Sequence, residues 1–251
     1  QTSSAVSVSS SPMSSDVPTV RKTLLQALKA TNGQASFTRS VSRKLQVGQV
    51  ELVQVNEKLQ SATVENRPVQ AGSMSATYKT ETAQSLGLEN TDFYFDKGVL
   101  HKITNLEDSA NTANNLQNAV TVAETGASAE AAVPAFYLNL TDKMISSVDV
   151  SQNGSDILYS FTLDPENSRS QVIELLKNQT DRLEFEEKSF ILDYNVCTAR
   201  SDAAGCVTEL SSSIGGRYKK NDVEQAGELT VKYTFSNLGT TEPPLPPAWI
   251  Q

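Results

Sequence analysis

The chain has 251 residues, of which 21 are basic and 29 acidic, so its formal net charge is −8. An acidic surface repels phosphate backbones, which argues against nucleic acid as a partner. Hydrophobic residues make up 38% of the chain, and no apolar run approaches the ~20 residues that a membrane-spanning helix needs.

Residues 1–17 are predicted to form a Ser-rich disordered tether, since eight of the first sixteen residues are serine. Such a segment is typical of an exported protein, although an ordinary disordered N-terminus has the same composition. A helix is predicted over 19–31, because apolar residues recur there at helical spacing and Asn32–Gly33 supplies a stop. The recurring residues are Val20, Leu24, Ala27 and Leu28.

A long β meander is predicted next, because apolar and polar residues alternate in successive segments. Its clearest hairpin is the sequence FYFDKGVLHKI, in which the turn Asp96-Lys97-Gly98 separates two strands. A second helix is predicted over 106–123, where Leu106, Ala110 and Ala113 open an apolar stripe. Residues 124–134 are predicted to form a loop or linker.

The second half repeats this pattern. Two strands flank the Asn153-Gly154 turn, and a helix is predicted over 165–178, with Asp164 as its cap. Three further strands follow, and Gly215–Gly216 within them indicates a turn or bulge. Residues 241–251 are predicted to be a Pro-rich tail.

These elements predict an α+β fold, mostly antiparallel β, in which one sheet packs on two or three helices. Residues 18–240 are predicted to be a single domain, with two β domains joined near 124–134 as the alternative. The two cysteines, Cys197 and Cys206, flank a predicted hairpin, so we expect a disulfide and therefore an oxidising compartment. Two unrelated buried thiols are the alternative.

No catalytic residue, metal site or cofactor is predicted. The single histidine, His101, lies in a predicted strand, and no phosphate-binding or metal-binding motif occurs. One weaker alternative is a carbohydrate-active enzyme, which needs two carboxylates across a cleft. Its candidates are Glu184, Glu186, Glu187 and Asp193.

The Ser-rich start, the opening helix, the FYFDKGVLHKI hairpin and the LDPENSRSQVIELL helix together resemble bacterial cell-envelope lipoproteins of the LolA, LppX and LprG group. That resemblance implies a curved, half-open antiparallel sheet over helices, with a lipid or other apolar ligand carried between them. A lipidated cysteine would begin such a lipoprotein, whereas this sequence begins with Gln1.

The resemblance also implies a ligand-lined inner surface, in which Arg39 and Arg43 could hold an acidic headgroup. A filled core and solvent-facing arginines are the alternative. The leading prediction is therefore an exported, non-enzymatic cell-envelope or extracellular protein that carries an apolar ligand, with membrane contact only through an N-terminal anchor. A secreted adhesin or protein-interaction module is the alternative. The ligand-binding candidates are Phe37, Arg39, Val41, Tyr159, Phe161, Tyr233 and Phe235.

Overall fold

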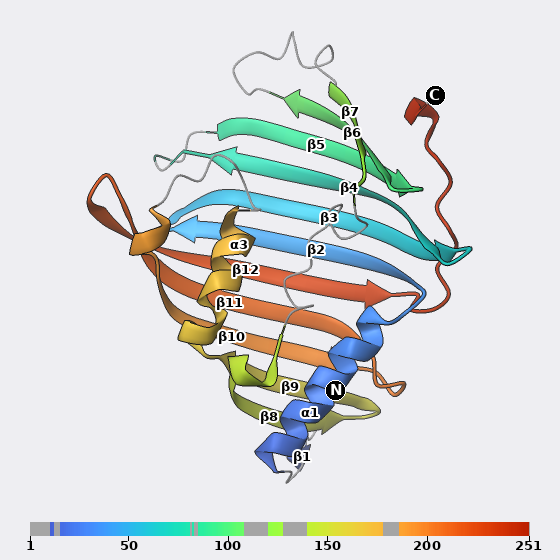
Figure 1. Ribbon diagram of the computed structural model, residues 1–251. Helices are drawn as coiled ribbons and strands as arrows, with labels where there is room; N and C mark the ends of the chain where they lie inside the picture. The colour runs from blue at the N-terminus through green and yellow to red at the C-terminus, as the bar shows by residue number, and fades with distance from the viewer. Residues whose placement is uncertain are drawn as a thin grey trace, which may run out of the picture.

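A single large antiparallel sheet dominates the computed structural model, and two α-helices of the described residues lie across one of its faces (Figure 1). The mostly antiparallel α+β fold is thus confirmed. The sheet is open, with β1 and β7 at its edges. The structure describes residues 11–12, 16–80, 82, 85–107, 120–127, 140–177 and 186–250.

Two meanders make up this sheet, in the order β1-β8-β9-β10-β11-β12-β2-β3-β4-β5-β6-β7. The last strand of the second meander, β12, pairs with the first strand of the first, β2, so both halves of the chain share one sheet. The strands are β1 Ser11–Pro12, β2 Ser36–Val47, β3 Val50–Val64, β4 Arg67–Lys79, β5 Ser85–Asp96, β6 Val99–Glu107, β7 Val120–Thr125, β8 Ile145–Asn153, β9 Asp156–Leu163, β10 Ile191–Ser201, β11 Val207–Lys220 and β12 Val223–Ser236.

Two-residue turns set the register of several hairpins. The predicted FYFDKGVLHKI hairpin is confirmed, because β5 and β6 join through Lys97 and Gly98, which have φ of 52° and 74°. Asn221 and Asp222 join β11 to β12 with φ of 50° and 63°. Both turns have positive φ at both central residues, which matches the twist of the flanking strands.

Helix α1, Val17–Asn32, occupies the predicted position and crosses the ends of several strands. Near its start, Arg21 donates from Nη2 to the Ser146 carbonyl at 3.0 Å. Near its end, the Thr31 hydroxyl donates to the Val207 carbonyl at 3.1 Å. These bonds hold the helix diagonally from β8 to β11, as Figure 1 shows, and its apolar stripe is buried against the sheet.

Helix α3, Pro165–Lys177, also forms where it is predicted. The Asn167 amide donates to the Asp164 carboxylate at 2.8 Å, so Asp164 is the N-cap. Arg169 donates from Nε to the Phe190 carbonyl at 3.0 Å, which ties the helix to the segment before β10. Short 3-10 helices span Asp142–Met144, Glu187–Ser189 and Ala248–Ile250.

The helix predicted over 106–123 is wrong where the structure describes that stretch. Strand β6 continues to Glu107, and Val120–Thr125 form β7 in register with Val99–Thr104. β7 has the sequence VTVAET, and Val and Thr favour a pleated strand over a helix because of their branched Cβ atoms. Residues 108–119 lie outside the described part of the chain.

The structure adds detail to the predictions for the two ends of the chain. Within the predicted tether, Ser11 and Pro12 pair with Gln152 and Ser151 of β8, and α1 begins at Val17. The C-terminal residues 241–247 have no regular secondary structure, and Trp249 is half-buried in the closing 3-10 turn.

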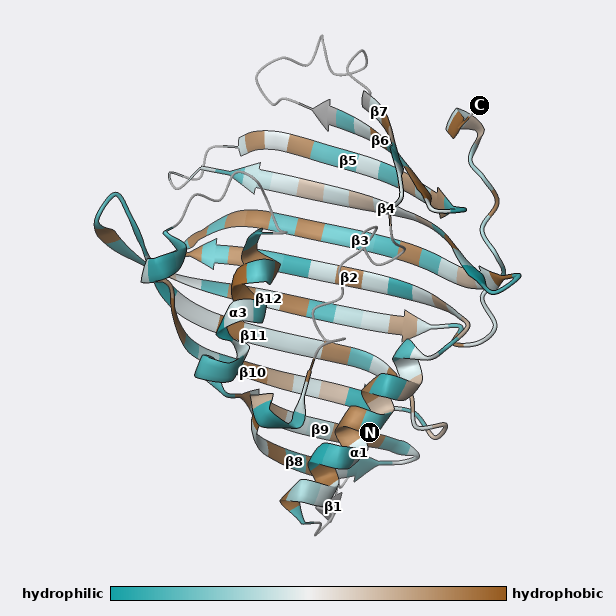
Figure 2. Ribbon diagram, in the orientation of Figure 1, coloured by the Kyte–Doolittle hydropathy of each residue, from teal (hydrophilic) through white to brown (hydrophobic). Residues whose placement is uncertain are grey.

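The sheet has two chemically different faces. On the inner face, which carries α1 and α3, residues such as Val41, Leu45 and Leu229 join one core with both helices. On the outer face, the alternate residues are polar and mostly exposed. Figure 2 shows this alternation along the strands. One dry face and one solvated face are typical of antiparallel sheets.

Candidate functional site

The predicted ligand-binding residues all lie on the inner face, and most belong to a packed core. Tyr159 and Phe161 on β9 are only 1% and 2% exposed, and they share a hydrophobic cluster with α1 and α3. Val41, Tyr233 and Phe235 belong to the same cluster. Phe37 meets Phe235 edge to face, with ring centroids 6.5 Å apart. A role in ligand contact stays a prediction for these residues.

The hollow between α3 and the sheet is small. It has a volume of about 30 Å³, roughly the share of one water molecule in the liquid. A lipid-sized ligand needs on the order of 300 Å³ or more. The hollow is lined by apolar residues of α3, β2, β11 and β12 and by Phe190.

Arg39 and Arg43 are buried on the inner face rather than emerging into solvent. They are 3% and 6% exposed, and Arg43 forms an ion pair with Glu57 of β3, which is 8% exposed. The pKa of Arg43 is lowered to about 10, mainly by burial and to a smaller extent by neighbouring Arg39, while Tyr233 and Tyr78 oppose the shift. Glu57 was not predicted as a site residue. Its parity with Val55 and Leu59 is the signal that places a charge on the apolar side of β3.

The predicted disulfide is wrong, because both cysteines are free and buried. Cys197 lies opposite Ser212 in the β10–β11 ladder, whereas Cys206 precedes β11 by one residue. Six residues separate Cys206 from Ser212, which is on the order of 20 Å along a strand, and a disulfide needs Cα atoms within about 7 Å. Each thiol has another partner: Cys197 Sγ lies 2.9 Å from Ser212 Oγ, and Cys206 Sγ accepts from Gln34.

We expect neither thiol to be oxidised to a disulfide in the purified protein. Burial raises the pKa of the Cys197 thiol to about 12, so iodoacetamide at about pH 8 should leave it unmodified in the native state. Unfolding without reductant should then add two alkyl groups by mass spectrometry, and an unchanged mass would contradict the structure. Because folding favours the neutral thiol, its stabilising contribution is lost as pH rises from about 9 to about 12.

A polar trough lies on the outer face, with a volume of about 370 Å³. Two cross-strand rows of five residues form it, each crossing β12, β2, β3, β4 and β5. All ten side chains are polar, and seven of them are Ser, Thr or Asn. The first row is Thr234, Ser40, Lys58, Ser73 and Asp92, and the second is Lys232, Ser42, Asn56, Ser75 and Asn90.

The shape of this polar trough follows from side-chain size. Short residues occupy β2 and β4 in both rows, and Lys58 and Lys232 stand beside them. Five strands spaced about 4.8 Å apart give a length of about 19 Å. The trough offers hydroxyl, amide, ammonium and carboxylate groups, so it can make hydrogen bonds in both senses along an extended polar ligand. Sequence analysis missed it, because the register between strands cannot be read from one sequence.

A second hollow, of about 270 Å³, lies on the same face where β10, β11, β12 and the β2–β3 turn meet. Tyr194 borders it with 42% of its surface exposed. Gly215 and Gly216 lie within β11 and are paired on both sides, so of the predicted turn or bulge the turn is wrong, whereas the register shift between Leu192 and Tyr194 places a bulge on β10 opposite them. They are small because two rings cover them, since a Cβ would come within 2.1 Å of Tyr194 at Gly215 and 2.8 Å of Phe190 at Gly216.

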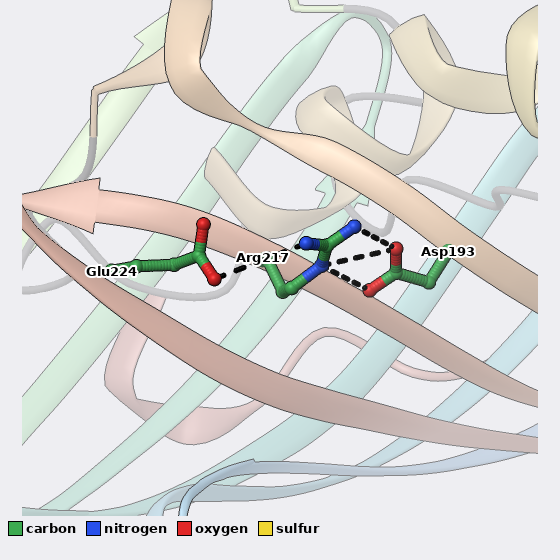
Figure 3. A network of polar contacts seen from close by, with 3 residues as sticks. All are labelled: Asp193, Arg217 and Glu224. Atoms are coloured by element: carbon green, nitrogen blue, oxygen red, sulfur yellow. Dashed lines mark hydrogen bonds and ion pairs between the residues drawn. The ribbon is translucent and has the colours of Figure 1, made fainter.

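An arginine fixes the carboxylate beside this hollow. Figure 3 shows the Arg217 guanidinium between Asp193 and Glu224. Arg217 donates from Nε and Nη2 to Asp193 at 2.9–3.2 Å, and its Nη1 lies 3.9 Å from Glu224. The hydrogen bond from Arg217 lowers the pKa of the Asp193 carboxyl. Asp193 is therefore held ionised, as an acceptor.

The other predicted carboxylates are dispersed. Glu184 lies outside the described residues, and Glu186 and Glu187 are exposed at a 3-10 turn. A hydrogen bond from Lys177 lowers the pKa of the Glu187 carboxyl, which is the opposite of the shift that a general acid needs. Within the described ranges, no group of His, Cys, Asp and Glu could hold a metal ion, and no described helix is long and apolar enough to cross a membrane.

Comparisons with known proteins give little further information. No protein-family model matches the chain, and no curated protein matches it at a significant level. One similar solved structure is a porin-like protein from Bacteroides uniformis ATCC 8492, with 10% sequence identity and a TM-score of 0.20. The similarity covers 81% of this chain and 98% of that one, but at this TM-score it supports no inference. The likeness to the LolA, LppX and LprG group stays a prediction.

Proposed function

We propose that the protein is a non-enzymatic binding module that holds a polar, hydroxyl-rich chain, a glycan, across the polar trough of its outer face. The observation that carries the proposal is the composition of the two rows: ten polar side chains in register on five consecutive strands, around a hollow of about 370 Å³. An exported, extracellular or cell-envelope location is part of the proposal. The free cysteines do not supply the argument for export that a disulfide would have given.

The chemistry of the trough favours hydroxyl groups as partners. Ser and Thr hydroxyls and Asn amides can each donate and accept, and hydroxyls of a glycan do both as well. Lys232 is held by Glu209 at 3.0 Å, which orients one donor at the end of the second row. Eleven of the thirteen residues that line the trough are polar, so hydrogen bonds to their side chains would give it specificity.

Carriage of an apolar ligand by a half-barrel, as in the LolA-like group, remains the second candidate. The buried Arg39, Arg43 and Glu57 favour this candidate, because the two arginines put positive charge on the inner face, where it could hold the acidic headgroup of such a ligand. The packing of Tyr159 and Phe161 against the helices favours the binding module, because those side chains already fill the space beneath α1 and α3.

Filling the trough tests the proposal. The double variant Ser42→Gln/Ser75→Gln keeps polarity and charge but places longer side chains in the second row. Affinity electrophoresis through gels containing a neutral α-glucan, a β-glucan, a mannan or a pectic polymer should show that the native chain is retarded by at least one of them. The double variant should lose about tenfold in affinity, which corresponds to 1.4 kcal/mol.

A matched control is available on the same face. Thr198 and Ser211 are direct cross-strand neighbours on β10 and β11, outside the trough. Thr198→Gln/Ser211→Gln should leave retardation unchanged. Equal losses in the two double variants, or no retardation of the native chain in any gel, would count against a glycan-binding trough.

A further inference from the structure

The hollow beside Tyr194 exists because small residues line it. Of its nine lining residues, four are glycines and one is alanine: Gly48, Gly215, Gly216, Gly227 and Ala226. They come from β11, β12 and the β2–β3 turn, so the gap spans neighbouring strands. Gly215 on β11 and Ala226 on β12 have outward parity, where a solvated sheet face would normally carry long polar side chains, as β12 does at Lys232. Gly216 and Gly227 have inward parity and also line the hollow beneath α3.

One aromatic ring borders this gap and is held in place. The virtual Cβ of Gly215 falls 2.1 Å, 2.4 Å and 2.8 Å from three ring atoms of Tyr194, so the ring lies directly over the glycine. Its exposed fraction of 42% leaves much of the ring open to solvent. A ring supported on one side by backbone offers its other side to a ligand with little loss of conformational freedom.

Fixed acceptors flank the ring. Asp193, next to Tyr194, is held ionised by Arg217. Across β11, Glu228 accepts a hydrogen bond from the Ser213 hydroxyl at 2.6 Å. Gln46, opposite Glu228 on β2, lines the same hollow. Carboxylates restrained in this way accept strong hydrogen bonds from hydroxyl groups.

From this geometry we propose that the Tyr194 hollow is a sugar-ring subsite, in which one pyranose ring stacks on Tyr194 and donates hydroxyls to Asp193 and Glu228. The inference rests on the proposed glycan binding and extends it. The C–H face of a pyranose carries slight positive charge and meets the negative face of an aromatic ring. A volume of about 270 Å³ suits one ring rather than a chain.

The subsite and the trough lie within reach of one ligand. Gln46 and Glu228 have the same parity as Ser42 and Lys232 on the same two strands, so all four face outward. The separation is four residues along each strand, about 13 Å. A glycan that lies across the trough could therefore extend one end onto Tyr194.

The test uses the full chain labelled with 3-fluorotyrosine. The chain has seven tyrosines, and the Tyr194→Phe variant assigns the Tyr194 signal in ¹⁹F NMR. Maltose, cellobiose, lactose, mannobiose and N,N′-diacetylchitobiose are then titrated to concentrations on the order of several mM, because one stacked ring supports only weak binding. At least one disaccharide should shift the Tyr194 signal and leave the buried Tyr159 signal in place.

Variants give the second readout. Tyr194→Ala and Glu228→Gln should each weaken binding of that disaccharide about tenfold. Val196→Ala is the control, since Val196 is 46% exposed on the same strand but does not line the hollow. A Tyr194 signal that no disaccharide shifts overturns the subsite and shows that the ring only covers Gly215, as aromatic residues do over strand glycines.

The two proposals fail separately. If Ser42→Gln/Ser75→Gln weakens retardation by a polysaccharide and Tyr194→Ala does not, the trough stands and the subsite is wrong. If Tyr194→Ala abolishes disaccharide binding and the trough variant binds polysaccharide normally, the subsite stands and the trough is wrong. No binding of any saccharide by the native chain overturns both.

Discussion

Glu57→Leu is expected to lower the free energy of unfolding by about 3–5 kcal/mol, because it leaves the buried Arg43 guanidinium without its carboxylate. Arg43 and Glu57 are 6% and 8% exposed, so water cannot replace the lost partner without opening the sheet. Arg39 lies close enough to lower the pKa of Arg43, so two positive charges would then share this region. Urea unfolding followed by circular dichroism measures the change.

A double variant separates the missing partner from the missing contact. Arg43→Met/Glu57→Leu removes both charges and keeps apolar volume, so it should recover most of the stability that Glu57→Leu loses. The exposed pair Lys44–Glu51 is the control, because removing Glu51 should cost no more than about 1 kcal/mol. A Glu57→Leu variant as stable as the native chain would show that Arg43 does not depend on this partner.

Local sequence signals predicted the elements well where one periodicity prevailed. α1 and α3 begin and end within about two residues of the prediction, because an apolar stripe agrees with the Asn32–Gly33 stop in α1 and with the Asp164 cap in α3. The stretch 106–123 failed because Leu106, Ala110 and Ala113 happen to recur at helical spacing. Val120 and Val122, two residues apart, fit a strand as well, and pairing with β6 decides between them.

The candidate sites depended on information that one sequence lacks. The Cys197–Cys206 prediction used a correct hairpin, but the turn is closed by Asp202, which accepts from the Cys206 amide, so Cys197 is left deep in the strand. The trough needs the registers of four strand pairs at once, and each could slip by two residues without changing the hydrophobic pattern. Of these site residues, only Glu57 could have been predicted from the sequence, because it is a charged residue at a position of β3 where the alternation calls for an apolar one.

Gly72 makes the second large prediction, because β4 passes close to its neighbours at this position. A Cβ there would lie 2.3 Å from the Lys58 carbonyl oxygen and 2.4 Å from the Phe93 ring. The ring belongs to a buried cluster with Leu59, Phe95 and Leu100, so it cannot swing away freely. Gly72→Ala should therefore destabilise the chain by about 3 kcal/mol, the upper end of the usual range for overpacking.

Two comparisons identify the cause of that loss. Ser73→Ala, one residue along on the exposed side of β4, should change stability by less than about 0.5 kcal/mol. Gly72→Ala/Phe93→Leu should recover only part of the loss, because the contact with the Lys58 carbonyl remains whatever residue replaces the ring. Full recovery of stability in the double variant would mean that the Phe93 ring is the sole reason why residue 72 must be glycine. Unchanged stability in Gly72→Ala would show that β3 and β4 can move apart at this position. Since β3 and β4 also carry the middle of the polar trough, the Gly72 variants connect packing on the inner face to binding on the outer one.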